Sequence, residues 1–160
     1  LHDEMLIDFD TNLKVFPPIR PKKMKKEFIK NIKNGNIDAV SSNHNPIESE
    51  KKKCSFSKAE FGIIGLESTF GILNTELKEE VELEKIITLL SINPRKILNI
   101  ECPKIEENNK ANFTLYDPEK KWVFKKSDLK SKSKNTPFEN YEFTGKVLGI
   151  INNGLIQLNN

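Results

Sequence analysis

The sequence has few of the residues on which metal centres, disulfide frameworks and nucleophilic sites depend. Its 160 residues include only two cysteines and two histidines. Cys54 and Cys102 belong to no CxxC pair, so neither a zinc ribbon nor a disulfide framework is indicated. A zinc site needs three or four ligands that converge on one point, and His2 and His44 do not supply that number. The residues themselves therefore predict no metal site in this chain.

Long apolar runs and glycine-rich phosphate loops are also missing. The chain shows no signal peptide and no membrane-spanning run, which predicts a cytoplasmic protein that binds no membrane. No Ser, His and Asp set of a hydrolase is identifiable. The apolar fraction of 36% is low and the charged fraction of 31% is high. Because the apolar residues fall in periodic runs, the composition still predicts a folded domain.

Lysine supplies nearly all of the positive charge. The densest clusters are Lys22 to Lys26 and Lys51 to Lys53, and the net charge is only +3. Neither cluster is interleaved with aromatic residues that could stack on bases. We therefore interpret both clusters as solvated surface and expect no nucleic-acid partner. An interaction or nucleic-acid module built from these lysines is the remaining alternative.

The first forty residues carry the pattern of a βαβ unit. Leu13 to Phe16 is a short extended run, which Pro17-Pro18 stops. Apolar residues every four positions predict a helix from Pro21 to Asn34, with Gly35 at its end. Ile37 to Ser42 then indicates a buried strand. Two strands joined through a helix imply a parallel pair with a right-handed crossover, so the fold class is α/β.

A polar stretch and three helices are predicted next. Residues 43–61 are polar, and a loop of that length in a compact domain is commonly functional. Helical periodicity follows from Gly62 to about Leu73 and again from about Lys78 to Leu90. Asn93-Pro94 then begins a short helix that runs to about Leu98.

The last sixty residues have a different pattern. Residues 101–110 are polar and predict a linker between a first domain, 1–100, and a second domain, 111–160. Phe113 and Leu115 alternate with polar neighbours, as strand residues do. Asn153-Gly154 lies between two apolar runs and predicts a β-hairpin. The second domain is therefore expected to be a small antiparallel β-sandwich.

Several blocks in consistent order resemble one enzyme family. Asn43-His44-Asn45-Pro46-Ile47 and Phe61-Gly62-Ile63-Ile64-Gly65-Leu66-Glu67 resemble the final barrel strand and following loop of dihydroorotases, which are cyclic amidohydrolases of the amidohydrolase superfamily. Further blocks that resemble the C-terminal part of this family are 10–20, 35–39, 93–98, 111–118 and 131–138. The resemblance implies the C-terminal portion of a TIM-type (β/α)8 barrel. Residues 1–100 would supply its last two βα units and outer helices.

The resemblance also assigns residues to a site. The family has Asp-His-Ala-Pro-His at the loop, where the aspartate touches the metal centre and acts as general base for attack of water on the ring amide. Asn43 takes the position of that base, and an amide cannot usefully accept a proton. Phe16 and Ile47 replace an asparagine and a histidine that contact substrate in the family. Phe61 and Gly62 keep the family residues, which contact substrate mainly through their backbone.

Zinc is the family's cofactor, and its other ligands belong to motifs that these 160 residues do not contain. This chain alone is therefore expected to bind no zinc. The resemblance implies a role in de novo pyrimidine biosynthesis as a catalytically impaired paralogue, structural in function. Its partner would be aspartate transcarbamoylase or another copy of itself. The alternative is an active zinc-dependent dihydroorotase, or a related enzyme that hydrolyses another cyclic amide.

Overall fold

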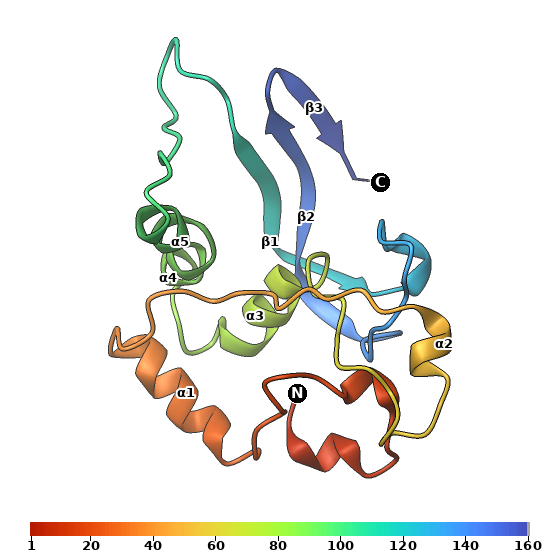
Figure 1. The fold of residues 1–160 in the computed structure, drawn as a ribbon. Helices are drawn as coiled ribbons and strands as arrows, with labels where there is room; N and C mark the ends of the chain where they lie inside the picture. Colours follow the sequence, from red (N-terminus) through yellow and green to blue (C-terminus); the bar gives the residue numbers. More distant parts are fainter. Residues whose placement is uncertain (160) are drawn as a thin grey trace. The chain divides into compact units, whose positions relative to one another are not determined.

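The computed structural model describes residues 1–159, and their contacts divide the chain into two compact units (Figure 1). The first unit contains Leu1–Asn36, Ser41–Thr69 and Val123–Tyr141, and the second contains Ile37–Val40, Phe70–Trp122 and Glu142–Asn160. Each unit is therefore assembled from segments that lie far apart in the sequence. The predicted domain boundaries near residues 100 and 111 stay a prediction.

Short helices and long irregular segments make up the first unit. Its helices are two 3₁₀ turns at Asp3–Leu6 and Thr11–Leu13, α1 (Met24–Lys33), α2 (Ser49–Lys52) and a 3₁₀ turn at Lys126–Asp128. Its buried apolar side chains come from both the helices and the irregular segments, and they are Leu13, Ile29, Ile32, Ile47, Ala59, Ile63, Ile64, Phe124, Leu129 and Phe138. Burial of these side chains is the main stabilising contribution to the unit.

Helix α1 confirms the helix predicted between Pro21 and Asn34. Ile29 and Ile32 face the core, and Lys30 and Lys33 lie in the last turn, where the helix dipole favours positive charge. The chain then leaves the helix through Gly35, whose φ of +75° suits glycine.

The two predicted strands of the βαβ unit are wrong as regular strands. Leu13 ends a 3₁₀ turn, and residues 37–42 run extended without a ladder in the described part of the chain. A strand needs a neighbour along its whole length. Within the first unit, the carbonyl of Lys14 accepts from the amide of Gly62 at 3.0 Å, and Val40 in the second unit donates to the carbonyl of Leu89 at 3.0 Å. Single bonds of this kind hold an extended chain but form no sheet.

The helix predicted from Gly62 to Leu73 begins later than expected. Residues 61–65 are extended, residues 66–68 form a turn, and α3 covers Thr69–Leu77. The amide of Ile64 donates to the carbonyl of Asn135 at 3.0 Å, and the carbonyl of Ile63 accepts from the amide of Asn45 at 2.8 Å. These partners, distant in sequence, satisfy the backbone in an extended form. The helical periodicity of the segment is thereby overridden.

The second unit contains the main helical layer and the sheet. A helical stretch consists of α4 (Leu83–Ile87), a π-helical turn (Thr88–Ile92) and α5 (Asn93–Ile97). The helix predicted from about Lys78 to Leu90 begins later, at Leu83, and continues through the π-helical turn, whereas the short helix predicted at Asn93-Pro94 is confirmed as α5. Ile86 and Leu89 are fully buried. Pro94 suits the first turn of α5, because proline has no N–H that the start of a helix would leave unpaired.

One three-stranded sheet forms in the order β1 (Phe113–Val123), β2 (Glu142–Asn152) and β3 (Leu155–Leu158). In Figure 1, β2 lies between the other two strands. Strands β2 and β3 pair antiparallel through the turn at Asn153-Gly154, where both residues have positive φ, so the predicted hairpin is confirmed. Residues 1–159 form only this one sheet, and the β-sandwich expected for residues 111–160 stays a prediction.

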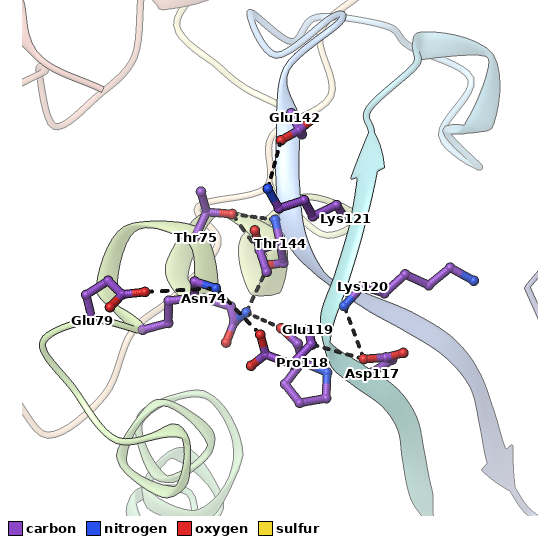
Figure 2. A network of polar contacts seen from close by, with 11 residues as sticks. Asn74, Thr75, Glu79, Asp117, Pro118, Glu119, Lys120, Lys121, Glu142 and Thr144 are labelled. Carbon is purple, nitrogen blue, oxygen red and sulfur yellow. Dashed lines mark hydrogen bonds and ion pairs between the residues drawn. The ribbon is translucent and has the colours of Figure 1, made fainter.

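Polar side chains join α3 to the sheet within the second unit (Figure 2). The buried amide of Asn74 donates to the carbonyls of Pro118 and Thr144 at 2.8 and 3.0 Å. The hydroxyl of Thr75 accepts from the amide of Thr144 at 2.8 Å. Without these bonds the polar groups would be buried without a partner, which costs about 1–3 kcal/mol for each group.

Candidate functional site

The loop Asn43–Ile47 lies in the first unit beside residues 61–66. His44 and Ile63 form an isolated parallel bridge, and the amide of Asn45 donates to the carbonyl of Ile63 at 2.8 Å. This pairing sets the direction in which the side chains of the loop project. The polar side chains of the loop then bind neighbouring backbone groups.

Asn43, which the resemblance assigns to the position of the family's base, donates a hydrogen bond. Its side-chain Nδ2 lies 2.9 Å from the carbonyl oxygen of Phe16. Its backbone has φ +48°, a left-handed conformation that asparagine tolerates better than most residues. The amide therefore holds a neighbouring segment in place, and it carries no group that could take up a proton.

His44 uses one ring nitrogen as an acceptor for the backbone. Its Nδ1 accepts from the amides of Gly65 and Leu66 at 3.2 and 3.3 Å. A neutral imidazole that accepts at Nδ1 carries its proton on Nε2. In this tautomer neither nitrogen offers a free lone pair to a metal ion.

The remaining part of the loop is fixed by Asn45 and by Asn135. Asn45 Nδ2 donates to the carbonyl of Phe61 at 3.0 Å. The amide of buried Asn135 binds on both sides, because its Oδ1 accepts from the N–H of Ile47 and its Nδ2 donates to the carbonyl of Asn45, each at 3.0 Å. Ile47 is only 8% exposed, so it belongs to the core and does not present its side chain to a substrate.

Phe16 and Phe61 are exposed aromatic residues of the site. Their side chains are 70% and 50% exposed, and their rings meet edge to face with centroids 6.2 Å apart. The ammonium of Lys14 lies 4.9 Å from the centre of the Phe61 ring, a cation–π geometry. The amide of Gly62 is bonded to the carbonyl of Lys14, so that amide is occupied within the protein.

The five residues that the resemblance assigned to the site therefore come together. Asn43 binds Phe16, Phe16 contacts Phe61, and a side chain on Gly62 would lie against Ile47. Their arrangement presents two exposed rings and bonded amides. It contains neither an acid nor a base positioned for proton transfer.

The donor set of the described residues does not fit a zinc ion. No three His, Cys, Asp or Glu side chains converge anywhere in residues 1–159. His2 lies apart from the loop in sequence and faces Glu4 at 3.6 Å, while Cys54 and Cys102 are each free and exposed. Zinc binding by this chain would need at least three such donors at one point.

Two residues beside the site were missed by the sequence reasoning. Asn135 lies within a block that resembles the family, but nothing in the pattern indicated a buried amide. Lys52 lies in a lysine cluster interpreted as solvated, and that interpretation is wrong for this residue. Lys52 is 6% exposed, and burial lowers the pKa of its ammonium group. Helix α2 explains the burial, because it turns Lys52 inward while Lys51 and Lys53 stay exposed.

Comparison with known proteins decides the relationship. No protein-family model matches the chain. The dihydroorotase of Chlorobaculum tepidum is 39% identical over 139 residues, which cover 86% of this chain and 32% of that protein. Over most of its length, the chain is similar to part of a dihydroorotase. The dihydroorotase of Caldicellulosiruptor saccharolyticus is 38% identical over 158 residues, which cover 98% of this dihydroorotase-like chain and 37% of that protein. The chain thus spans about a third of the length of these relatives.

Solved structures show the same fold. The L-hydantoinase (dihydropyrimidinase) of Arthrobacter aurescens superposes with a TM-score of 0.88 at 23% identity, over 98% of the dihydroorotase-like chain and 36% of the other. The inactive dihydroorotase-like domain of the CAD-like multifunctional protein of Chaetomium thermophilum gives a TM-score of 0.62 at 14% identity, over 86% of this chain and 36% of that chain. The expected mixed α/β fold with a small antiparallel sheet is confirmed.

No helix in the described part of the chain combines the length and the apolar character that crossing a membrane requires.

Proposed function

We propose that this chain is part of a dihydroorotase-family protein of de novo pyrimidine biosynthesis that has lost catalysis and acts structurally, as a scaffold for aspartate transcarbamoylase. The observation that supports this proposal is the bond from Asn43 Nδ2 to the carbonyl of Phe16. At the position where the family has its base, the side chain acts as a donor to the backbone.

The loss of catalysis follows from the chemistry of three side chains. Proton abstraction needs an acceptor near the reacting water, and the amide of Asn43 is a very weak base. Ile47 lies in the core and Phe16 presents a ring, so neither replaces the polar substrate contacts of the family. In the same loop, His44 Nδ1 is occupied by two backbone amides. Restoring any one of these residues leaves the other changes in place.

The barrel and the cellular location belong to the same proposal. Residues 1–100 would complete the last two βα units of a (β/α)8 barrel together with other parts of the protein. The closely superposed hydantoinase fold supports this arrangement. The protein would act in the cytoplasm, where pyrimidine synthesis takes place, and its partners would include neither membranes nor nucleic acid. Another copy of the chain is the alternative partner.

The second candidate function is an active zinc-dependent dihydroorotase or a related cyclic amidohydrolase. The observation that favours it is the identity of 38–39% to proteins named dihydroorotase, including over the segment that contains the loop. In that case other parts of the protein would supply the metal ligands. Phe16 and Phe61 would then form one wall of a more apolar pocket. The fold of an inactive domain in Chaetomium thermophilum shows that this architecture also occurs without catalysis.

Enzyme assay of the full-length protein separates the two functions. Dihydroorotate hydrolysis is measured with added zinc, and the metal content is determined in parallel. Turnover at or below the rate without protein, together with substoichiometric zinc, is expected. A turnover number within the ordinary range for enzymes, about 1–1000 per second, would overturn the loss of catalysis.

The scaffold role has its own experiment. The full-length protein is mixed with aspartate transcarbamoylase of the same organism and examined by analytical ultracentrifugation. A joint species of defined stoichiometry is expected. Separate sedimentation at micromolar concentrations of both proteins would contradict the scaffold role while leaving the loss of catalysis untouched.

A further inference from the structure

Lys52 is a buried lysine whose ammonium is surrounded by backbone carbonyls. It lies at the end of α2 (Ser49–Lys52), and its Nζ donates to the carbonyls of Glu60 at 2.8 Å, Thr11 at 2.9 Å and Lys14 at 3.3 Å. Lysine is rarely buried unless its charge is satisfied. Here three carbonyl dipoles point their negative ends at one cation.

The three carbonyls belong to the two segments that carry the exposed rings. Thr11 and Lys14 precede Phe16 by five and two positions, and Glu60 directly precedes Phe61. The hydroxyl of Thr11 also donates to the carbonyl of Lys52 at 2.7 Å, so the contact is reciprocal. Lys52 thus ties both segments to α2 at one point.

A second contact joins the same segments directly. The carbonyl of Lys14 accepts from Lys52 Nζ and from the amide of Gly62 at 3.0 Å. If the ammonium were removed, the carbonyls of Thr11 and Glu60 would lose this partner, while the bond from Gly62 to Lys14 could persist. The position of Phe16 relative to Phe61 therefore depends on the cation and not on one backbone bond alone.

The neighbouring lysine offers a matched comparison. Lys51 is exposed, and its Nζ pairs with Glu60 Oε1 at 3.1 Å on the surface. Exposed ion pairs contribute little, because water and salt screen them. Lys51 and Lys52 therefore share a helix and a nearby partner residue but differ in burial.

We propose that Lys52 is a positioning residue whose ammonium serves as an internal cation, fixing the segments of Phe16 and Phe61 beside Asn43. A cation between converging carbonyls draws them together as a bound monovalent ion would. Here the positive charge is part of the protein, because it lies on a lysine side chain. The inference goes beyond the proposed function, because it holds whether the site is structural or catalytic.

Hydrogen exchange of the full-length protein tests the positioning. Lys52→Met keeps an unbranched side chain of similar length without the charge, and Lys51→Met is the control. Exchange is expected to accelerate about tenfold or more in peptides covering residues 11–16 and 58–62 of Lys52→Met, since one net hydrogen bond is worth roughly that factor. Peptides covering β2 should keep the wild-type rate, and Lys51→Met should resemble wild type throughout. Unchanged exchange in Lys52→Met, or equal acceleration in both units, would overturn the proposal.

Chemical rescue distinguishes a cation from mere packing. Lys52→Ala leaves space for a small amine, so propylammonium is expected to restore protection in residues 11–16 and 58–62. Propanol and tetramethylammonium at the same concentration are the controls, since the first lacks the charge and the second lacks N–H donors. If Lys52→Ala does not fold, recovery of the folded fraction in each additive gives the same comparison. Equal recovery in propanol, or none in propylammonium, would show that Lys52 acts by filling space.

Discussion

The side-chain amide of Asn43 lies 2.9 Å from the backbone carbonyl of Phe16 and donates to it. A carboxylate in the same place would bring two acceptors together. An amide in place of an acid at this position would therefore have a structural consequence as well as a chemical one. A carboxylate would repel the carbonyl of Phe16, whereas the amide holds the Phe16 segment.

Asn43→Asp is expected to destabilise the protein without creating activity. Asn43→Ala should show the loss of one hydrogen bond, which costs about 0.5–1.5 kcal/mol. Because the Asn43 side chain is exposed, we expect a value at the lower end of this range. At neutral pH the carboxylate should cost more than alanine, because it faces the carbonyl of Phe16. The excess should vanish as the pH falls below about 4, where the carboxyl group regains a proton to donate. Urea unfolding across this pH range measures it, and greater stability of Asn43→Asp at neutral pH would contradict the bond.

Asn135→Asp should release the loop that contains Ile47. A carboxylate cannot donate to the carbonyl of Asn45, and the loss of this part-buried bond costs about 1–3 kcal/mol. Asn74→Asp is the matched control, because Asn74 is equally buried and its amide also donates to carbonyls, but in the second unit. Hydrogen exchange should increase in residues 43–47 for Asn135→Asp and in the sheet for Asn74→Asp. The same exchange pattern in both variants would refute a local role of Asn135.

Gly62→Ala should disturb the site by crowding. A Cβ on Gly62 would lie 2.5 Å from Ile47 Cγ1 and 2.7 Å from the carbonyl oxygen of Asn45, so the loop would have to move. Overpacking of this kind costs typically about 1–3 kcal/mol. Gly154→Ala is the control, since a Cβ added there would meet no atom within 4 Å. Only the positive φ of +78° disfavours alanine at this position. Thermal unfolding compares the two variants, and a smaller loss for Gly62→Ala than for Gly154→Ala would argue against the close approach.

The lowered pKa of Lys52 predicts how the free energy of unfolding changes with pH. Burial is the largest cause of a lower pKa for Lys52 in the folded protein, below its ordinary value of 10.5. Between the folded and the ordinary pKa, the unfolded chain binds more protons, so the free energy of unfolding rises with pH. The wild-type protein should therefore gain stability relative to Lys52→Met as the pH approaches 10.5. Urea unfolding is best compared in a Lys51→Met background, because the hydrogen bond to Glu60 raises the pKa of Lys51. If the wild type instead lost stability relative to Lys52→Met, the three carbonyls would stabilise the ammonium more than burial destabilises it.

Local patterns predicted the elements whose own residues stabilise them. Helix α1 has an apolar face and a favourable charge at its end, and α5 begins at Asn93-Pro94 as expected. The hairpin of β2 and β3 follows from Asn153-Gly154, because these residues accept the positive φ that the turn requires. Each of these signals lies within a few residues of the structure that it determines.

Predictions failed where a distant partner decides the conformation. Residues 37–42 have the composition of a strand but form no ladder, and residues 62–65 have helical periodicity but are extended. In the second case, Asn135 and Asn45 provide backbone partners that a helix could not use. The same is true of Lys52, whose burial depends on three carbonyls from two other segments.

The sequence by itself determined the similarity to dihydroorotases, because this depends on the identity and order of side chains. The site positions, and Asn43 as the replacement of an acid, stay predictions from that resemblance. Only the tertiary structure decided what the changed residues do. It placed Ile47 in the core, turned Asn43, His44 and Asn45 toward neighbouring backbone groups, and buried the ammonium of Lys52 among carbonyls. Hydrogen bonds and burial join residues that lie far apart along the chain, and no local pattern records which of them will meet.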